Sequence, residues 1–323
     1  MALGEFDLID KYFRPPVRRA ALGGGDDCAL LVPTPGMQLA VSTDLLVEGR
    51  HFLSTVAPDR LGHKALAVNL SDLAACGAEP LAFTLSLSLP RAEAAFLAPF
   101  SAGLLALAEQ HDIELVGGDT TAGPLTIGIT VFGEVPEGLA LLRSGAMPGD
   151  DVWVSGCLGD ARLALEVFRG HAALPGEAFT AVREAMERPQ PRVALGQALR
   201  GVATSAIDLS DGLLGDLAHI RRRSRVGATL WLETLPRSAA LDAMPEALQR
   251  ECLLAGGDDY ELLFTAPPSA AEAVRAAGLA SGTPVTRIGC IEPAAIGMRV
   301  FCETHGSEPL DLSAYAGFDH FKS

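Results

Sequence analysis

The sequence predicts an α/β protein of two domains, and three observations lead to this prediction. The chain has 323 residues, which is more than one hydrophobic core usually organises. Hydrophobic residues make up 49% of the chain and charged residues 20%, which is the balance of a protein that folds. Stretches with strand-like and helix-like patterns alternate on both sides of a short polar segment, which indicates mixed α/β layers in each half.

The first half contains both kinds of element. Strand-like patterns occupy residues 39–43, 113–116 and 125–135, and the last of these alternates apolar residues with a period of two. Residues 59–76 have a helical pattern that ends at Gly77 and is followed by Pro80, both ordinary stop signals.

The polar segment at residues 143–150, RSGAMPGD, consists of small and turn-forming residues, so we expect one domain at residues 1–142 and another at residues 143–323. Beyond it, strand-like runs alternate with Ala- and Leu-rich helical stretches. These runs are VWVS, VATSAI, TLWLE, YELLFT and VTRIG, in that order.

Charge and composition exclude several classes of function. The net charge of −15 disfavours binding to nucleic acid or to an anionic membrane, because both need clustered Lys and Arg. The one basic cluster, Arg221, Arg222, Arg223 and Arg225, follows a predicted helix and is typical of a solvated helix end. No signal-peptide pattern or apolar run of membrane-spanning length is present, and none of the six cysteines forms a Cys-x-x-Cys pair. We therefore expect a cytoplasmic protein without a disulfide framework.

Aspartates repeatedly follow the predicted buried strands. Asp44 ends QLAVSTD, Asp119 follows IELVGG, and Asp208 and Asp211 follow VATSAI. Asp26 and Asp27 lie in a glycine-rich turn before another apolar run. Carboxylates presented on loops at sheet edges suit hard cations such as Mg²⁺, although Asp and Gly also favour turns without any functional reason.

The position of Asp72 indicates a function more strongly than the positions of the other aspartates do. It shares a helical stripe with Ala65, Asn69 and Cys76, and that stripe faces inward if the pattern holds. An ionised carboxylate there needs a cation or strong donors, and only Lys64 and His63 are near it in sequence. We infer a metal ion as the compensating charge, with an exposed Asp on a misjudged helix face as the alternative.

Several common sites are excluded by inspection. None of the three lysines follows a glycine, which excludes a P-loop, and no G-x-G-x-x-G, H-E-x-x-H or G-x-S-x-G pattern occurs. Glycines nevertheless lie directly beside the acids at residues 23–25, 117–118 and 256–257, where bare backbone amides could approach phosphates.

Nine motifs, in order along essentially the whole chain, resemble the thiamine-monophosphate kinase family. They are GEFDLI, GDDCAL, STDLLVEGRHF, KALAVNLSDLAACGAEP, GGDTT, RSGA, IDLSDGL, GGDDYEL and GFDHF. The resemblance implies the fold of aminoimidazole ribonucleotide synthetase, with an N-terminal domain that forms a dimeric β-barrel and a C-terminal mixed α/β domain. It also implies ATP-dependent phosphorylation of thiamine monophosphate to thiamine diphosphate by a homodimer.

The resemblance further implies roles for single residues. The magnesium ligands would be Asp27, Thr43, Asp44, Asp72, Asp119, Asp208 and Asp211, with Asp44, Asp72 and Asp208 at the centre of catalysis. ATP would contact Gly118, Asp119, Arg143 and Ser210, and thiamine monophosphate would contact His51, Asp258 and Phe318. Asp258 and Phe318 depart from the family pattern, in which we expect Glu and Tyr or Trp, respectively.

So many acids suit this chemistry, because two phosphorylated molecules repel each other until cations neutralise them. The accepting phosphate oxygen is already ionised, so no dedicated general base is required. Three alternatives remain: another ATP-using enzyme of the same superfamily, a metal-dependent phosphohydrolase, and a regulatory protein that binds nucleotide without turnover.

Overall fold

The computed structural model describes residues 5–24, 27–303, 306 and 308–315. Its chain divides into two compact units. The first comprises Met1–Leu73 and Ala78–Gly138, and the second comprises Ala74–Gly77 and Leu139–Ser323. Each unit has its own sheet, so the α/β architecture with two layered halves is confirmed.

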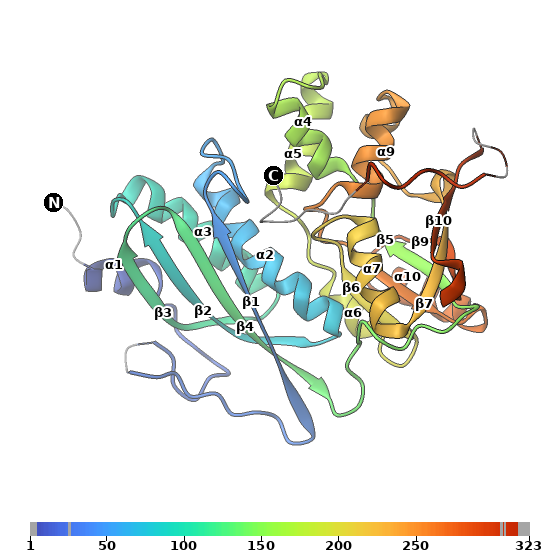
Figure 1. Ribbon diagram of the computed structural model, residues 1–323. Coiled ribbons are helices and arrows are strands. Elements are labelled where there is room, and N and C mark those ends of the chain that lie inside the picture. The colour runs from blue at the N-terminus through green and yellow to red at the C-terminus, as the bar shows by residue number, and fades with distance from the viewer. Residues whose placement is uncertain (1–4, 25–26, 304–305, 307, 316–323) are drawn as a thin grey trace. The chain divides into compact units, whose positions relative to one another are not determined.

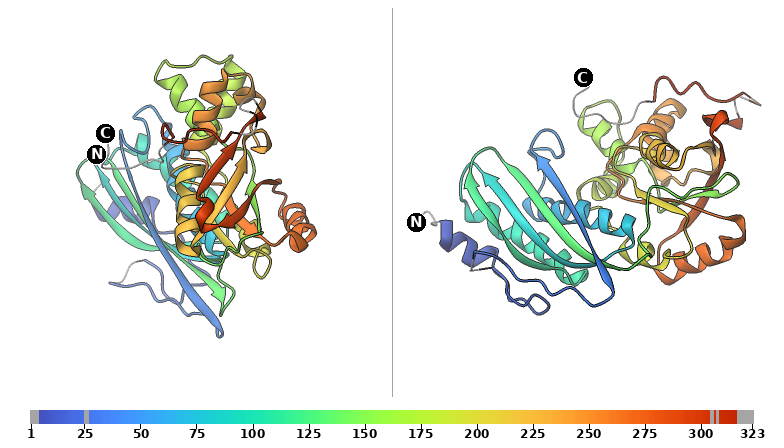
Figure 2. Two further views of the ribbon diagram at one scale, coloured as in Figure 1. Left: turned by 45° about the vertical axis from the view of Figure 1, so that its right-hand side comes forward. Right: turned by 60° about the horizontal axis from the view of Figure 1, so that its bottom comes forward.

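The first unit is a four-stranded sheet with helices on one face (Figures 1 and 2). Its elements are α1 (Glu5–Tyr12), β1 (Met37–Val47), α2 (Pro58–Cys76), β2 (Glu79–Leu89), α3 (Ala94–Gln110), β3 (Glu114–Ala122) and β4 (Thr126–Pro136). The strand order is β1-β4-β2-β3, with only β2 and β3 parallel. Within the described residues this sheet is open, so the barrel implied by the resemblance is not formed by one chain.

Two glycines allow α2 and α3 to pack very closely. A Cβ on Gly62 would lie 2.0 Å from the carbonyl oxygen of Phe100, and a Cβ on Gly103 would lie 1.9 Å from that of Asp59. The helix backbones are therefore in direct contact, which any side chain at either position would prevent. These two glycines therefore set the distance between α2 and α3.

The opposite face of the sheet is only partly covered. At one end, Val17, Ala20, Ala29 and Leu31 pack on Leu81, Ala82 and Val116. Elsewhere, Leu39, Val41 and Leu45 of the edge strand β1 are 46%, 59% and 57% exposed. An apolar strip on an edge strand is a surface suited to another chain.

The second unit is a six-stranded sheet with order β10-β7-β9-β5-β8-β6, in which only β10 and β7 are parallel. Its strands are β5 (Asp151–Ser155), β6 (Ser205–Asp208), β7 (Val226–Trp231), β8 (Leu262–Ala266), β9 (Val285–Pro293) and β10 (Met298–Phe301). Its helices are α4 (Asp160–Phe168), α5 (Gly176–Glu187), α6 (Val193–Ala198), α7 (Leu213–Ser224), α8 (Ala239–Asp242), α9 (Glu246–Ala255) and α10 (Ala271–Ala280), with short 3₁₀ turns η1 (Leu232–Thr234), η2 (Pro268–Ala270) and η3 (Ala294–Ile296). Residues such as Val152, Leu163 and Leu217 form its core.

The predicted elements appear close to their expected positions, with one exception, and two strands were missed. The predicted run VATSAI is a strand only from Ser205, and β2 and β10 were not predicted. The helical pattern at residues 59–76 is α2, and Arg221, Arg222 and Arg223 form the last turn of α7, which confirms a basic helix end. Over the described residues, no helix is long and apolar enough to cross a membrane.

Candidate active site

Asp44 and Asp72 share the contact between β1 and α2. The backbone amide of Asp44 donates to Oδ1 of Asn69 at 3.0 Å, and Ser42 Oγ donates to Oδ2 of Asp72 at 2.5 Å. Ala65 and Asn69 are buried and Asp72 is half-buried, so the helical stripe does face the sheet. The carboxylate of Asp72 thus has the strong donor that its position requires.

The strand register places Thr43 and Asp119 on the other face of the sheet. Asp119 pairs with Ser86, which pairs with Gly128, and Gly128 pairs with Leu45 on β1. Paired residues point to the same face, and neighbours along a strand point to opposite faces. The sheet therefore separates Asp119 from Asp44, and Asp27 comes from the chain segment before β1.

Gly118 is required by the sheet itself. Its φ is +152°, and a Cβ there would lie 1.9 Å from the carbonyl oxygen of Leu85 on β2. Only glycine fits this approach between β2 and β3. The glycine beside Asp119 therefore has a structural reason that is independent of any nucleotide.

His51 lies in the turn after β1 with a fixed ring orientation. Its Nδ1 accepts a hydrogen bond from the Val47 amide at 2.9 Å, and its own amide donates to the Val47 carbonyl at 3.0 Å. An Nδ1 that accepts cannot carry the proton, so in the neutral ring the proton is on Nε2. The turn thus fixes the tautomer of the His51 ring.

In the second unit, the loop after β6 is held by a buried carboxylate. The amides of Ser210 and Asp211 both donate to Oδ2 of Asp216, at 3.1 Å each. Burial, followed by the charge of Asp211, raises the pKa of Asp216 to about 7. Sequence reasoning missed Asp216, although an acid in the first turn of a helix directly after LSDG is a recognisable signal.

The same loop is joined to the segment that carries Asp258. The Asp258 amide donates to the Ser210 carbonyl at 2.9 Å. The Tyr260 amide donates to the Leu209 carbonyl at 2.8 Å, and the Leu209 amide donates to the Glu261 carbonyl at 2.9 Å. Asp258 has a φ of +74°, and a Cβ on Gly257 would lie 2.4 Å from the Ser210 oxygen. A predicted ATP contact and a predicted thiamine monophosphate contact are thus held together by the backbone.

Two acids that follow Asp258 anchor this segment. The carboxylate of Glu261 accepts from Arg192 Nε at 2.7 Å, from Arg192 Nη2 at 2.5 Å and from the Ser155 hydroxyl. Asp259 accepts from the Gly159 amide at 2.9 Å, and burial raises its pKa well above the ordinary value. Neither acid was singled out from the sequence, because its partners are 69 to 106 residues away along the chain.

Arg143 lies beside the end of α7. Ser224 Oγ donates to the Arg143 carbonyl at 3.4 Å and accepts from the Ala146 amide at 3.2 Å, which fixes the connecting segment there. Burial, then the charges of Arg143 and Arg222, lower the pKa of His219 on the same helix. His219 is therefore close enough to Arg143 to feel its charge, and no pattern in the sequence indicated this proximity.

The donors suit magnesium, although no complete cage is present. Among the described residues, no group of three or more His, Cys, Asp and Glu is arranged to hold a metal ion. Mg²⁺ is usually bound by one or two carboxylates together with substrate phosphates, so the pair Asp44 and Asp72 fits this mode. Asp208, buried at the end of β6, is a similar donor in the second unit. Phe318 and Asp26 lie outside the described residues.

Comparisons with known proteins show which class of protein this chain belongs to. The family described as AIR synthase related protein, N-terminal domain, matches residues 25–135. The thiamine-monophosphate kinase of Escherichia coli O157:H7 is 45% identical over 328 residues, which cover 99% of each chain. The chain belongs to the thiamine-monophosphate kinase family.

Solved structures agree with this assignment. The crystal structure of thiamine-monophosphate kinase from Stenotrophomonas maltophilia K279a is similar with a TM-score of 0.82 and 45% identity, covering 88% of this chain and 91% of that one. A structure of AaThiL complexed with AMPPCP and TMP is similar with a TM-score of 0.75 and 32% identity, covering 90% and 89% of the two chains.

Proposed function

We propose that this protein transfers the γ-phosphoryl group of ATP to the phosphate of thiamine monophosphate, which yields ADP and thiamine diphosphate. Membership of the kinase family supports the reaction, as does the relative that was crystallised with AMPPCP and TMP. The structural observation that carries the proposal is the backbone bond between Asp258 and Ser210, because it couples the predicted contacts for the two substrates. Positioning of two phosphates is the main task in such a transfer.

The chain's own groups suit a direct transfer. A phosphate oxygen of thiamine monophosphate attacks the γ-phosphorus, the bond to the β,γ-bridging oxygen breaks, and the electron pair leaves with ADP. Gly118, Asp119, Arg143 and Ser210 would bind the nucleotide, and His51 would contact thiamine monophosphate. Bound magnesium would supply charge neutralisation for the phosphates. We expect several ions, held by Asp27, Thr43, Asp44, Asp72, Asp119, Asp208 and Asp211. Asp44 and Asp119 would not share an ion, because they lie on opposite faces of the first-unit sheet.

We also propose that the active protein is a cytoplasmic homodimer in which two first-unit sheets close into one barrel. The exposed apolar side chains of Leu39, Val41 and Leu45 support this, since pairing would remove them from water. Strand β1 lies at the edge of an open sheet, which supports the same arrangement. A monomeric mass in solution at micromolar concentration would contradict it.

One assay separates the kinase from its alternatives. The protein is incubated with Mg²⁺, ATP and thiamine monophosphate while ADP, free phosphate and thiamine diphosphate are followed. ADP formed in equal amount to thiamine diphosphate supports the kinase. Free phosphate instead indicates a phosphohydrolase, and binding without turnover indicates a regulatory protein.

A further inference from the structure

Asp27 lies before β1 in a segment that we call the hairpin, defined by its two described arms, residues 18–24 and 27–34. Leu22 and Leu30 form an antiparallel bridge, in which the Leu30 amide donates to the Leu22 carbonyl at 2.9 Å and the Ala21 amide donates to the Leu30 carbonyl at 2.8 Å. Asp27 is exposed beyond this bridge. Its position therefore depends on what holds the two arms of the hairpin against the sheet.

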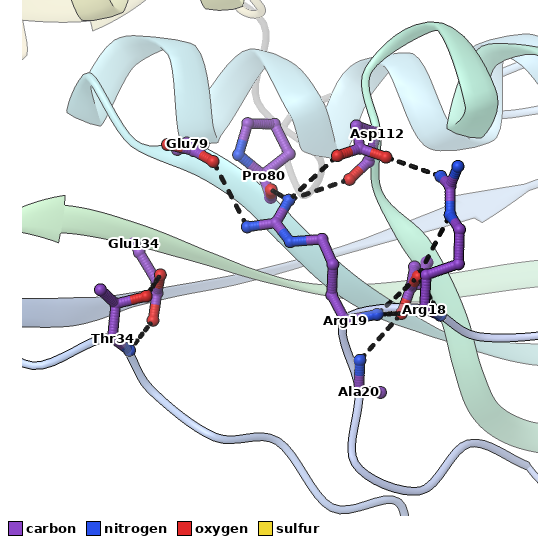
Figure 3. A network of polar contacts seen from close by, with 9 residues as sticks. Arg18, Arg19, Ala20, Thr34, Glu79, Pro80, Asp112 and Glu134 are labelled. Atoms are coloured by element: carbon purple, nitrogen blue, oxygen red, sulfur yellow. Dashed lines mark hydrogen bonds and ion pairs between the residues drawn. The ribbon is translucent and has the colours of Figure 1, made fainter.

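One arm is held by a buried carboxylate. Glu114, at the start of β3, accepts hydrogen bonds from three consecutive backbone amides (Figure 3). These are the amides of Arg18 at 2.5 Å, of Arg19 at 3.0 Å and of Ala20 at 3.0 Å. Three successive amides that converge on one anion form a nest, and the side chain of Glu114 is only 6% exposed.

The nest favours the ionised form of the Glu114 carboxyl group. Burial alone would raise the pKa of its carboxyl group, but the three amide bonds and the charge of Arg18 together lower it. The Arg19 side chain adds bonds to the carbonyls of Pro80 and Asp112, at 3.0 and 3.1 Å. The arm is thus fixed to the sheet by its backbone and by a side chain.

The other arm is held by a second buried acid with different chemistry. Glu134 on β4 accepts from the Thr34 amide at 2.6 Å and from the Thr34 hydroxyl at 2.8 Å (Figure 3). Here one of the two donors is a hydroxyl, which can also accept a hydrogen bond. A residue that replaces Glu134 can therefore donate one hydrogen bond and accept the other, whereas a residue that replaces Glu114 must accept all of them.

We propose that Glu114 is a positioning residue for magnesium binding: by accepting the three amides at residues 18–20, it sets the place of the hairpin and so of Asp27. The proposal rests on the proposed function, in which Asp27 is a magnesium ligand. Glu114 itself touches neither metal nor substrate. It acts through the arm and the Leu22–Leu30 bridge.

The test compares Glu114→Gln with Glu134→Gln. A Gln at position 134 can accept from the Thr34 amide and donate to the Thr34 hydroxyl, so the contact is kept. At position 114 both carboxylate oxygens accept from backbone amides, and a Gln would replace one of them with an NH₂ group, which cannot accept. The same substitution should thus release one arm and leave the other in place.

We expect Glu114→Gln to need about tenfold more Mg²⁺ for half-maximal activity, because only a fraction of hairpins is in the competent position, while Glu134→Gln stays within about twofold of wild type. The KM for thiamine monophosphate at saturating Mg²⁺ should change little in both. At the same concentrations of MgCl₂ and AMPPCP, the rise in Tm should be smaller in Glu114→Gln than in wild type and unchanged in Glu134→Gln. Equal magnesium requirements in the two variants would overturn the proposal.

Asp27→Asn distinguishes a failure of the metal assignment from a failure of the positioning role of Glu114. If it leaves the magnesium requirement unchanged, Asp27 is not a ligand and the positioning proposal fails with that assignment. If Asp27→Asn raises the requirement and Glu114→Gln does not, only the positioning proposal fails. In the double variant, Glu114→Gln should add nothing to Asp27→Asn, since both act on the same ligand.

Glu114→Asp covers the case in which Glu114→Gln does not fold. It keeps the charge with one methylene less, so it should retain part of the nest. An intermediate magnesium requirement supports the proposal, and a wild-type requirement in a folded Glu114→Asp protein with weakened amide protection at residues 18–20 overturns it.

Discussion

The amide of Asp258 donates to the carbonyl of Ser210 at 2.9 Å, while the amide of Ser210 donates to the carboxylate of Asp216. One residue of the loop after β6 thus connects a buried acid to the segment expected to meet thiamine monophosphate. Asp258 has a φ of +74°, a conformation that persists only where its surroundings determine it. A shift of the loop should therefore displace the proposed contacts for both substrates.

Gly257→Ala should test this coupling. Its Cβ would lie 2.4 Å from the Ser210 oxygen, so the segment and the loop must separate. We expect a loss of about 1–3 kcal/mol in the free energy of unfolding and a higher KM for both ATP and thiamine monophosphate. Gly176→Ala is the matched control, because nothing lies within 4 Å of a Cβ there. A rise in KM for one substrate alone would show that the two contacts are independent.

Replacing His51 should raise the KM for thiamine monophosphate more than the KM for ATP. His51→Ala removes both the Nδ1 acceptor of the Val47 amide and the Nε2 donor, so the KM for thiamine monophosphate should rise much more than that for ATP. His51→Asn keeps an acceptor near Nδ1 and loses Nε2, so it should retain the turn but not the substrate contact. Steady-state kinetics with each substrate varied in turn provide the measurement. Equal increases in the two KM values would remove His51 from the proposed site.

Much of this arrangement follows from local patterns in the sequence. The three- and four-residue spacing of Ala65, Asn69 and Asp72 correctly predicted the inward face of α2, because helix geometry alone fixes it. The strand β2 also carries a clear signal, since LAFTLSLSL alternates with a period of two, but Gly77 and Pro80 were interpreted only as the end of the helix.

Other features depend on pairing between distant segments and have no local signal. Asp119 and Asp44 lie on opposite faces because of a register that includes a bulge between β2 and β3. Glu114 and Glu261 look like ordinary charged residues beside apolar runs, and only the folded chain reveals the amides of residues 18–20 or the Arg192 side chain as their partners. Buried acids are thus the part of the site that sequence patterns reveal least.

The stability of the second unit should depend on pH through Glu166. This buried carboxylate binds His171 Nδ1 at 2.7 Å, Arg162 Nε at 2.8 Å and Arg169 Nη1 at 2.9 Å, and although burial opposes them, these contacts lower its pKa below 4.5. A lowered pKa in the folded state means that its stabilisation is present above about pH 4.5 and is lost as the pH falls further.

Urea unfolding between pH 7 and pH 3 provides the measurement. Glu166→Gln should be less stable than wild type at pH 7, and the difference should shrink below about pH 4.5 as the wild-type carboxylate becomes protonated. The exposed Glu177→Gln on α5 serves as the control and should show no such convergence. A difference between Glu166→Gln and wild type that stays constant down to pH 3 would refute this account.

The metal assignment is tested by replacing Asp72 and, separately, Asp44 with Asn. Both changes keep the size of the side chain and remove its charge, and in Asp72→Asn the amide oxygen could still accept the hydrogen bond from Ser42 Oγ. Carboxylates gathered to receive Mg²⁺ repel one another in the metal-free protein, so its stability should stay unchanged or rise. Activity should fall by at least ~10²-fold in kcat, since a ligand that neutralises the transferring phosphates is lost.

Asp59→Asn, on the first turn of α2, is the control for an acid that contributes to stability but binds no metal. Asp59 is exposed and placed to interact with the helix dipole, so its loss should cost about 0.3–1 kcal/mol of stability with little change in kcat. Thermal melts with and without Mg²⁺, beside steady-state kinetics, compare the three variants. If Asp72→Asn and Asp44→Asn behave like Asp59→Asn, with a lower Tm in the absence of Mg²⁺ and a kcat near wild type, neither carboxylate binds the metal.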